Sequence, residues 1–195
     1  MNNKELGNFY CNKGLELLNE NSISMAVNVL RKSVAIDEYS SDNLNLLGLC
    51  YYTLIEFEKA KYYWEKSIKI NNSDKNRAFE YLANMKSKDF LIMCEEYNAA
   101  LELCYDGKYK KALRKLNSLP YKNFVNLYNV IGLCNYAIGN KKGAINAWKK
   151  AIALDKDNEY ANTYLMKMTD CICRRFSIIN SIKGLFKNII CGKII

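Results

Sequence analysis

A short stretch that occurs twice constrains the fold of this chain more than any other feature of its sequence. Leu47-Gly48-Leu49-Cys50-Tyr51 returns in the second half of the chain as Ile131-Gly132-Leu133-Cys134. In each copy an alanine and a tryptophan follow at the same offsets, as Ala60 and Trp64 and as Ala144 and Trp148. Small residues let two helices approach, and large residues fill the space between neighbouring helix pairs. Because one such hairpin cannot cover its own apolar side chains, the pattern predicts stacked helical hairpins.

The same spacing continues towards the N-terminus with a period of 34 residues, and in this it resembles the tetratricopeptide repeat (TPR) family. The pairs with this separation are Gly14 and Gly48, Ala26 and Ala60, and Leu30 and Trp64. The resemblance implies hairpins over residues 7–40, 41–74 and 125–158, and a poorer copy that begins near Met93 and is cut short by Pro120. The expected fold is therefore an all-α, TPR-type α-solenoid of antiparallel helix hairpins with a C-terminal amphipathic helix.

The turn inside each hairpin supports this register. A left-handed backbone conformation at that position suits glycine or asparagine and is costly for other residues. Asn21, Gly107 and Gly139 occupy it in three of the hairpins, whereas Ile55 departs from the pattern in the remaining one. We therefore expect left-handed turns at the first three positions.

Three segments are expected along the chain. Residues 1–86 would hold two hairpins and a covering helix, which Asp74 would cap and whose Phe79 would face inward. Residues 87–170 would hold the poorer hairpin, the last hairpin and a closing helix, and residues 171–195 form a basic tail. Since residues 75–92 belong to no full repeat, the register breaks between the first two segments.

The composition of the chain indicates its cellular location and the state of its cysteines. It has 195 residues, 50% of them hydrophobic; its first six residues lead into no apolar segment, and no apolar run is long enough to span a bilayer. We therefore expect a cytoplasmic protein, and the abundance of Lys, Asn, Ile and Tyr is typical of a low-GC bacterial source. The eight cysteines are expected to be small buried hydrophobes rather than disulfides.

Residues that would support catalysis or cofactor binding are scarce. The chain has no histidine, which removes the commonest general base and every Ser-His or Cys-His arrangement. No phosphate-binding glycine loop of the strand-to-helix kind occurs. Cys171, Cys173 and Cys191 lack a fourth ligand and fit no common zinc finger. The sequence therefore predicts a protein that is not an enzyme and holds no metal and no cofactor.

Charge is distributed unevenly along the chain. Up to Asp106 there are 12 Lys and Arg against 16 Asp and Glu, a net of −4, and from Gly107 onward there are 17 against 4, a net of +13. The later half is expected to meet an anionic partner, whether an acidic protein, a membrane surface or, least favoured, nucleic acid. The simpler interpretation is a solvated helix face.

The tail has no acidic residue and carries Arg174, Arg175, Lys183 and Lys187. Its apolar residues fall on one broad helical face, which predicts an amphipathic helix. This helix would pack back on the solenoid or on a second copy of the chain in a homodimer. Alternatively, its cations would hold it at an anionic membrane surface, on the inner face of the cell membrane.

The family resemblance also implies where a partner binds. In TPR proteins the first helices of the hairpins line a concave groove. The matching positions are Asn8, Cys11 and Leu15 in the first hairpin, Asp42, Asn45, Leu49 and Tyr52 in the second, and Asn126, Asn129, Leu133 and Tyr136 in the last. Asparagine amides would hold an extended peptide backbone, and tyrosines would supply apolar contact area. Cys11 and Leu15 stand where a carboxylate clamp for chaperone tails would need Lys and Asn, which argues against that ligand.

These features predict a non-enzymatic protein-interaction module. It would be a TPR scaffold or adaptor that binds a peptide or helix of an unidentified protein in its groove, and that partner would be acidic where it meets the basic half. The alternative is a peripheral membrane adaptor that docks on anionic lipid through the basic C-terminal helix.

Overall fold

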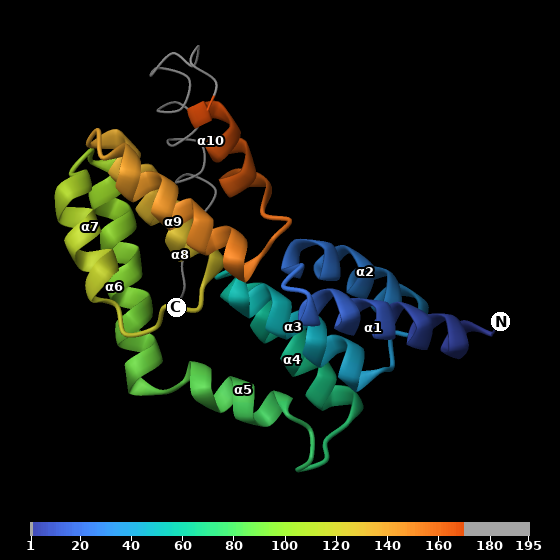
Figure 1. Cartoon of the computed structure of the whole chain (residues 1–195). Coiled ribbons are helices and arrows are strands. Elements are labelled where there is room, and N and C mark those ends of the chain that lie inside the picture. Colours follow the sequence, from blue (N-terminus) through green and yellow to red (C-terminus); the bar gives the residue numbers. More distant parts are fainter. Residues whose placement is uncertain (1, 170–195) are drawn as a thin grey trace. The chain divides into compact units, whose positions relative to one another are not determined.

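The described part of the chain is helical throughout. The computed structural model describes residues 2–169, so the tail with Arg174, Arg175, Lys183 and Lys187 lies outside the described residues. Within residues 2–169 the chain forms ten helices and no strand. In chain order (Figure 1) they are α1 (Asn3–Asn19), α2 (Ile23–Ile36), α3 (Ser41–Thr53), α4 (Phe57–Ile70), α5 (Ala78–Met85), α6 (Lys88–Tyr105), α7 (Tyr109–Ser118), α8 (Val125–Ala137), α9 (Lys141–Leu154) and α10 (Glu159–Thr169).

The helices belong to two compact units. Unit 1 contains residues 2–87 together with Leu154–Asp157, and unit 2 contains Lys88–Ala153 and the described residues from Asn158 onward. Unit 1 therefore holds α1 to α5. Unit 2 holds α6 to α10, apart from the last residue of α9.

In unit 1, α1 pairs with α2 and α3 pairs with α4, as the repeat spacing predicts (Figure 1). Two glycines allow the helices of each pair to approach closely. A Cβ atom on Gly14 would lie 2.5 Å from the Leu30 side chain, and one on Gly48 would overlap the Trp64 ring. Leu30 and Trp64 are themselves buried. The 34-residue period thus reflects one small-against-large contact that both hairpins make.

A hydrogen bond also recurs in both hairpins of unit 1. Ser33 Oγ donates to the Gly7 carbonyl oxygen at 2.8 Å, and Ser67 Oγ donates to the Ser41 carbonyl oxygen at 3.1 Å. Both serines are fully buried, so each bond satisfies a hydroxyl that would otherwise be costly to bury. Each bond also ties the second helix of its hairpin to the start of the first.

The left-handed turns are confirmed. The backbone angle φ is 56° at Asn21, 73° at Gly107 and 84° at Gly139. Ile55 adopts the same conformation with a φ of 62°, although its β-branched side chain makes it unfavourable. The backbone bond from Glu56 N to the Tyr51 carbonyl oxygen, 2.8 Å long, closes this turn. The hairpin therefore keeps its geometry even where the residue type departs from the pattern.

The covering helix is present, but two details of its prediction are wrong. α5 begins at Ala78 rather than beside Asp74, because residues 74 and 75 form a turn, and Asn76 Oδ1 accepts the Ala78 N–H at 3.1 Å. Phe79 is 40% exposed and so does not face inward. The Tyr81 ring packs against Trp64 instead, with 4.9 Å between the ring centroids.

Unit 2 contains two hairpins, a poorer one formed by α6 and α7 and one formed by α8 and α9 that follows the repeat spacing. α7 ends at Ser118, two residues before Pro120, as expected for a residue that cannot continue a helix. In the pair α8 and α9, a Cβ atom on Gly132 would overlap the Trp148 ring, which repeats the contact of unit 1. α10 closes this hairpin, because its Tyr164 ring lies 5.1 Å from the Trp148 ring.

Candidate peptide-binding surface

α1 and α3, the first helices of the two hairpins in unit 1, carry two predicted groove residues that interact electrostatically. Cys11 lies on α1 and Asp42 on α3. Burial raises the pKa of the Cys11 thiol, and the carboxylate of Asp42 raises it further. Electrostatic effects between partly exposed groups act over short distances in salt solution. The Cys11 thiol on α1 is therefore sensitive to the charge of Asp42 on α3.

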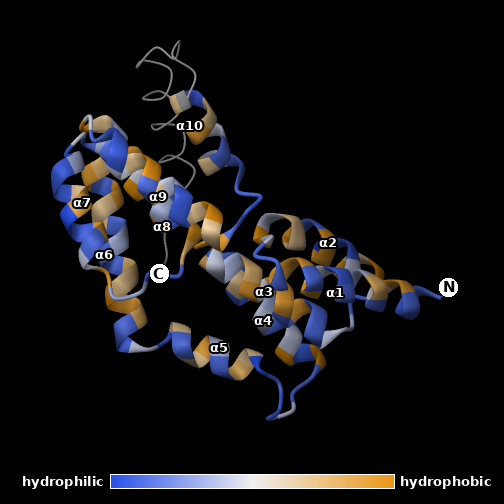
Figure 2. Ribbon diagram, in the orientation of Figure 1, coloured by the Kyte–Doolittle hydropathy of each residue, from blue (hydrophilic) through white to orange (hydrophobic). Residues whose placement is uncertain are grey.

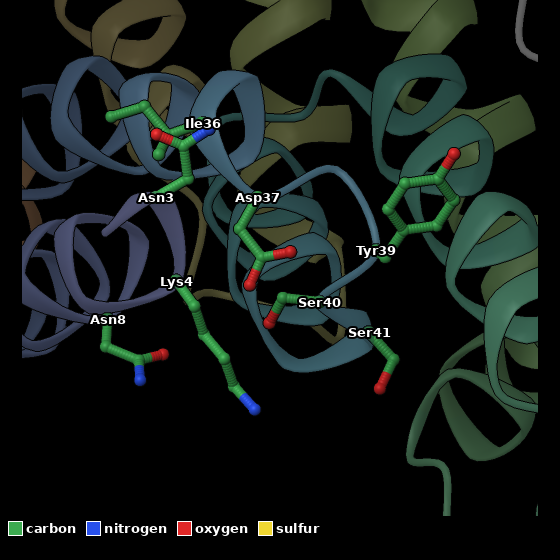
Figure 3. Close-up of a pocket in the computed structure, with 8 residues that line it drawn as sticks. All are labelled: Asn3, Lys4, Asn8, Ile36, Asp37, Tyr39, Ser40 and Ser41. Carbon is green, nitrogen blue, oxygen red and sulfur yellow. The ribbon is translucent and has the colours of Figure 1, made fainter.

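An open pocket of about 540 Å³ lies where the start of α1 meets the end of α2 and the start of α3. Its lining residues are Asn3, Lys4, Asn8, Ile36, Asp37, Tyr39, Ser40 and Ser41. In Figure 3, Lys4 and Asn8 extend from α1 on the same side as the hydroxyls of Ser40 and Ser41, and Asp37 lies between the two groups. One of the predicted groove residues, Asn8, thus belongs to a hollow formed by both hairpins.

The pocket is lined mostly by polar groups. The amides and hydroxyls both donate and accept hydrogen bonds, as the N–H and C=O groups of a peptide backbone require. Lys4 contributes one ammonium group and Asp37 one carboxylate. Tyr39 has 75% of its surface exposed and offers an aromatic face beside these polar groups.

The other predicted residues of α1 and α3 are accessible to different degrees. Asn8 and Asp42 are exposed, and Leu15 is 39% exposed. Leu49 and Tyr52 are half-buried. The Tyr52 ring packs against neighbouring aromatic rings, with centroid distances of 5.2 Å to Phe57 and 5.8 Å to Trp64. Packing of this kind holds the ring in one orientation and leaves part of it open to a ligand.

Asn45 was expected to hold a peptide backbone, but its amide is engaged inside unit 1. Its Nδ2 donates to Asn76 Oδ1 at 2.8 Å. Asn76 is only 5% exposed, and its own Nδ2 donates to Ser67 Oγ at 3.1 Å and to the Asn71 carbonyl oxygen at 2.8 Å. Asn45 Oδ1 is buried and has no hydrogen-bond partner. Asn45 therefore fixes the loop that follows α4.

The corresponding residues of α8 are more deeply buried. Asn129 and Leu133 are 5% and 2% exposed, and Asn129 Nδ2 donates to Asn126 Oδ1 at 3.2 Å. Asn126 and Tyr136 are half-buried, and the Tyr136 ring lies 6.3 Å from the Trp148 ring. The expectation that Asn129 and Leu133 are accessible is therefore not met. Their positions repeat those of Asn45 and Leu49 in sequence, but their surroundings differ.

Repeat spacing missed seven of the eight residues that line the pocket, among them Lys4, Asp37, Ser40 and Ser41. The repeat pattern marks positions where helices pack along their length, whereas these residues lie at helix ends or in the connection between α2 and α3. Ser40 carries the one local signal, because its hydroxyl accepts from Asn43 N at 3.4 Å and caps α3. That signal predicts where a helix starts and says nothing about a pocket.

The cysteines of the described region have the character of core residues. Cys50, Cys94, Cys104 and Cys134 are buried, and Cys11 is half-buried. Burial raises the pKa of Cys50 and of Cys94 to about 12, so these thiols stay protonated at neutral pH. The Sγ atoms of Cys104 and Cys134 lie 3.2 Å apart, and this hydrogen bond, together with burial, raises the pKa of Cys134.

In residues 2–169, no group of three or more cysteine or acidic side chains is placed to hold a metal ion. None of the helices in the same range is long and apolar enough to cross a membrane.

Comparisons with known proteins show which repeat family and which solved structures the chain is similar to. Residues 7–39 match the family model described as a tetratricopeptide repeat, and no curated protein matches the chain. The fold is similar to the TPR domain of P58(IPK), at 15% identity, 96% coverage of this chain, 57% of that chain and a TM-score of 0.49. It is also similar to pilF of Pseudomonas aeruginosa, at 18% identity, 95% and 77% coverage and a TM-score of 0.37. A third similar structure is YrrB, a TPR protein with an unusual peptide-binding site. It is 16% identical, the match covers 80% of this chain and 90% of that chain, and the TM-score is 0.36.

The paired helices, the left-handed turns and the small-against-large contacts define an α-helical repeat protein. The matched residues 7–39 cover nearly all of the hairpin formed by α1 and α2. That hairpin matches a tetratricopeptide repeat, and the described residues 2–169 form an all-α helical-repeat fold.

Proposed function

We propose that this chain is a non-enzymatic protein-interaction module that binds an extended peptide along α1 and α3 of unit 1. The observation that carries the proposal is that Asn8 of α1 and Ser41 of α3, from two successive first helices, line one open polar pocket. Helical repeats characteristically bind partners along such stacked helices.

The chemistry of this surface suggests the kind of peptide. The Asn8 amide and the hydroxyls of Ser40 and Ser41 can pair with main-chain groups without reading the side chains. Asp37 and Lys4 line the pocket, and the exposed carboxylate of Asp42 directly follows the pocket residue Ser41 in the chain. A peptide with a cationic side chain therefore fits this part of the chain better than an acidic one does.

The proposal is tested with Asn8→Arg, which places a long cationic side chain at the edge of the pocket. Peptides are first selected from a random library against the full chain, and their affinity is then measured by fluorescence anisotropy. We expect Asn8→Arg to weaken binding at least about tenfold, or about 1.4 kcal/mol.

Asn28→Arg is the matched control, since Asn28 is exposed on α2 and does not line the pocket. It should bind the selected peptides as tightly as the natural chain does, and circular dichroism should show equal helicity for both variants. Failure to select any peptide, or equal binding by both variants, would contradict the proposal.

Docking through the tail is the second function that the sequence predicts. It depends on Arg174, Arg175, Lys183 and Lys187, which lie outside the described residues. This membrane role, a homodimer through the same helix and a cytoplasmic location all stay predictions.

A further inference from the structure

A long part of unit 2 carries positive charge alone. No acidic residue occurs between Asp106 and Asp155, a stretch that contains α7, α8 and α9. Within Tyr109–Leu154 there are eight lysines and one arginine. Seven of these nine residues are exposed, and we call them the basic face. They are Lys110, Lys111 and Arg114 on α7 and Lys141, Lys142, Lys149 and Lys150 on α9.

The basic face points away from the core of unit 2. On α7 the buried residues are apolar, among them Leu113 and Leu116, and on α9 they include Trp148 and Ala151. The cations lie on the remaining sides of both helices, and Figure 2 shows the hydrophilic character along α7. α7 and α9 are the second helices of their hairpins, so this face is separate from the first helices that carry the predicted groove.

Lys122 adds a positive charge between the cations of α7 and those of α9. Its Nζ donates to the Asn117 carbonyl oxygen at 2.7 Å, at the end of α7. Burial lowers the pKa of Lys122, and the nearby charge of Lys150 on α9 lowers it further. Lys150 itself lies over the Tyr128 ring, 5.4 Å from its centroid. Positive charge therefore extends from the end of α7 to α9.

The residues of the basic face have no counterions of their own in the described part of the chain. In unit 1, Lys13 pairs with Glu16 at 2.8 Å and Lys66 pairs with Glu38 at 3.8 Å. Within residues 2–169, none of the seven basic-face residues forms an ion pair. Like charges that are gathered without counterions repel one another, so folding gives no reason to collect them.

We propose that the basic face docks on an anionic lipid bilayer. Clusters of four to eight Lys and Arg on an amphipathic helix are typical of binding to anionic lipid. Lysine predominates over arginine here, and a lysine acts as a point charge rather than as a bidentate reader of single phosphates.

The test uses the full chain with vesicles of phosphatidylcholine, either alone or with about 30% phosphatidylglycerol. The basic-face variant carries Lys111→Glu, Arg114→Glu and Lys149→Glu. Its matched control carries Arg31→Glu, Lys61→Glu and Lys69→Glu at exposed positions of unit 1, which changes the net charge equally. The partition coefficient on anionic vesicles should fall at least about tenfold in the basic-face variant and less than about twofold in the control.

Two further measurements separate this surface from the others. Asn8→Arg should bind anionic vesicles like the natural chain, since it changes only the predicted groove. A tail variant with Arg174→Glu, Lys183→Glu and Lys187→Glu should keep most of the binding. Equal loss in the control, loss in the tail variant alone, or binding of an oligonucleotide without binding of anionic vesicles would each overturn the proposal.

Discussion

Ile55 has a left-handed backbone with a φ of 62°, which its β-branched side chain disfavours. This conformation costs a residue other than glycine about 1–2 kcal/mol, and asparagine tolerates it better. The first hairpin has Asn21 at the equivalent position. At the scale of a single residue, we expect Ile55→Asn to raise the free energy of unfolding by about 0.5–1 kcal/mol, as measured by urea denaturation.

Ile138→Asn is the control for this substitution. Ile138 lies just before the turn of another hairpin, is 37% exposed and has an ordinary φ of −87°. The same change of side chain there should give no gain in stability. If Ile55→Asn were no more stable than the natural chain, the contacts of the half-buried Ile55 side chain would outweigh the backbone strain.

At the scale of an element, one buried amide joins α5 to the hairpin formed by α3 and α4. Asn76 accepts from Asn45 Nδ2 at 2.8 Å and from Ala78 N at 3.1 Å, and it donates to Ser67 Oγ and to the Asn71 carbonyl oxygen. Asn76→Ala should lower the free energy of unfolding by about 2–3 kcal/mol, because several buried groups lose their partners at once. Urea denaturation gives the loss, and hydrogen exchange should be faster in α5.

Asn84→Ala provides the comparison, since Asn84 is an exposed asparagine on α5. Its stability and its hydrogen exchange should stay close to those of the natural chain. Similar values for both variants would mean that α5 is held by apolar contacts such as the one between Tyr81 and Trp64, and that the amide adds little.

The hairpins also show how far an element can be predicted from its sequence. Gly48 against Trp64 and Gly132 against Trp148 were expected from spacing and are present, because both partners lie in one hairpin at a constant separation. The start of α5 was not predicted correctly. It depends on a turn at residues 74 and 75 and on Asn76, which bonds to a residue of α3 that is distant in sequence.

At the scale of the whole molecule, the two units carry buried thiols that report on their opening. Cys50 lies in unit 1 and Cys134 in unit 2, and both stay protonated while buried. Gly48→Ala inserts a methyl group against Trp64, and overpacking of this kind costs about 1–3 kcal/mol. At a pH of about 8 it should speed labelling of Cys50 by about tenfold and leave Cys134 nearly unchanged.

Gly132→Ala should have the opposite pattern, with faster labelling of Cys134 and little change at Cys50, because its methyl group would meet Trp148. Mass spectrometry of peptides locates the label on each cysteine. If either variant accelerated both thiols equally, the two units would open together as one cooperative structure.

The sequence by itself determined the helical class, the pairs of small and large residues and the left-handed turns, since each follows from spacing within one hairpin. Tertiary structure alone decided which predicted groove residues are accessible. Asn8 lines an open pocket, Asn45 bonds to Asn76, and Asn129 is 5% exposed, although all three are asparagines on first helices. The physical reason is that exposure and hydrogen-bond partners depend on segments brought together from distant parts of the chain, which no repeat period encodes.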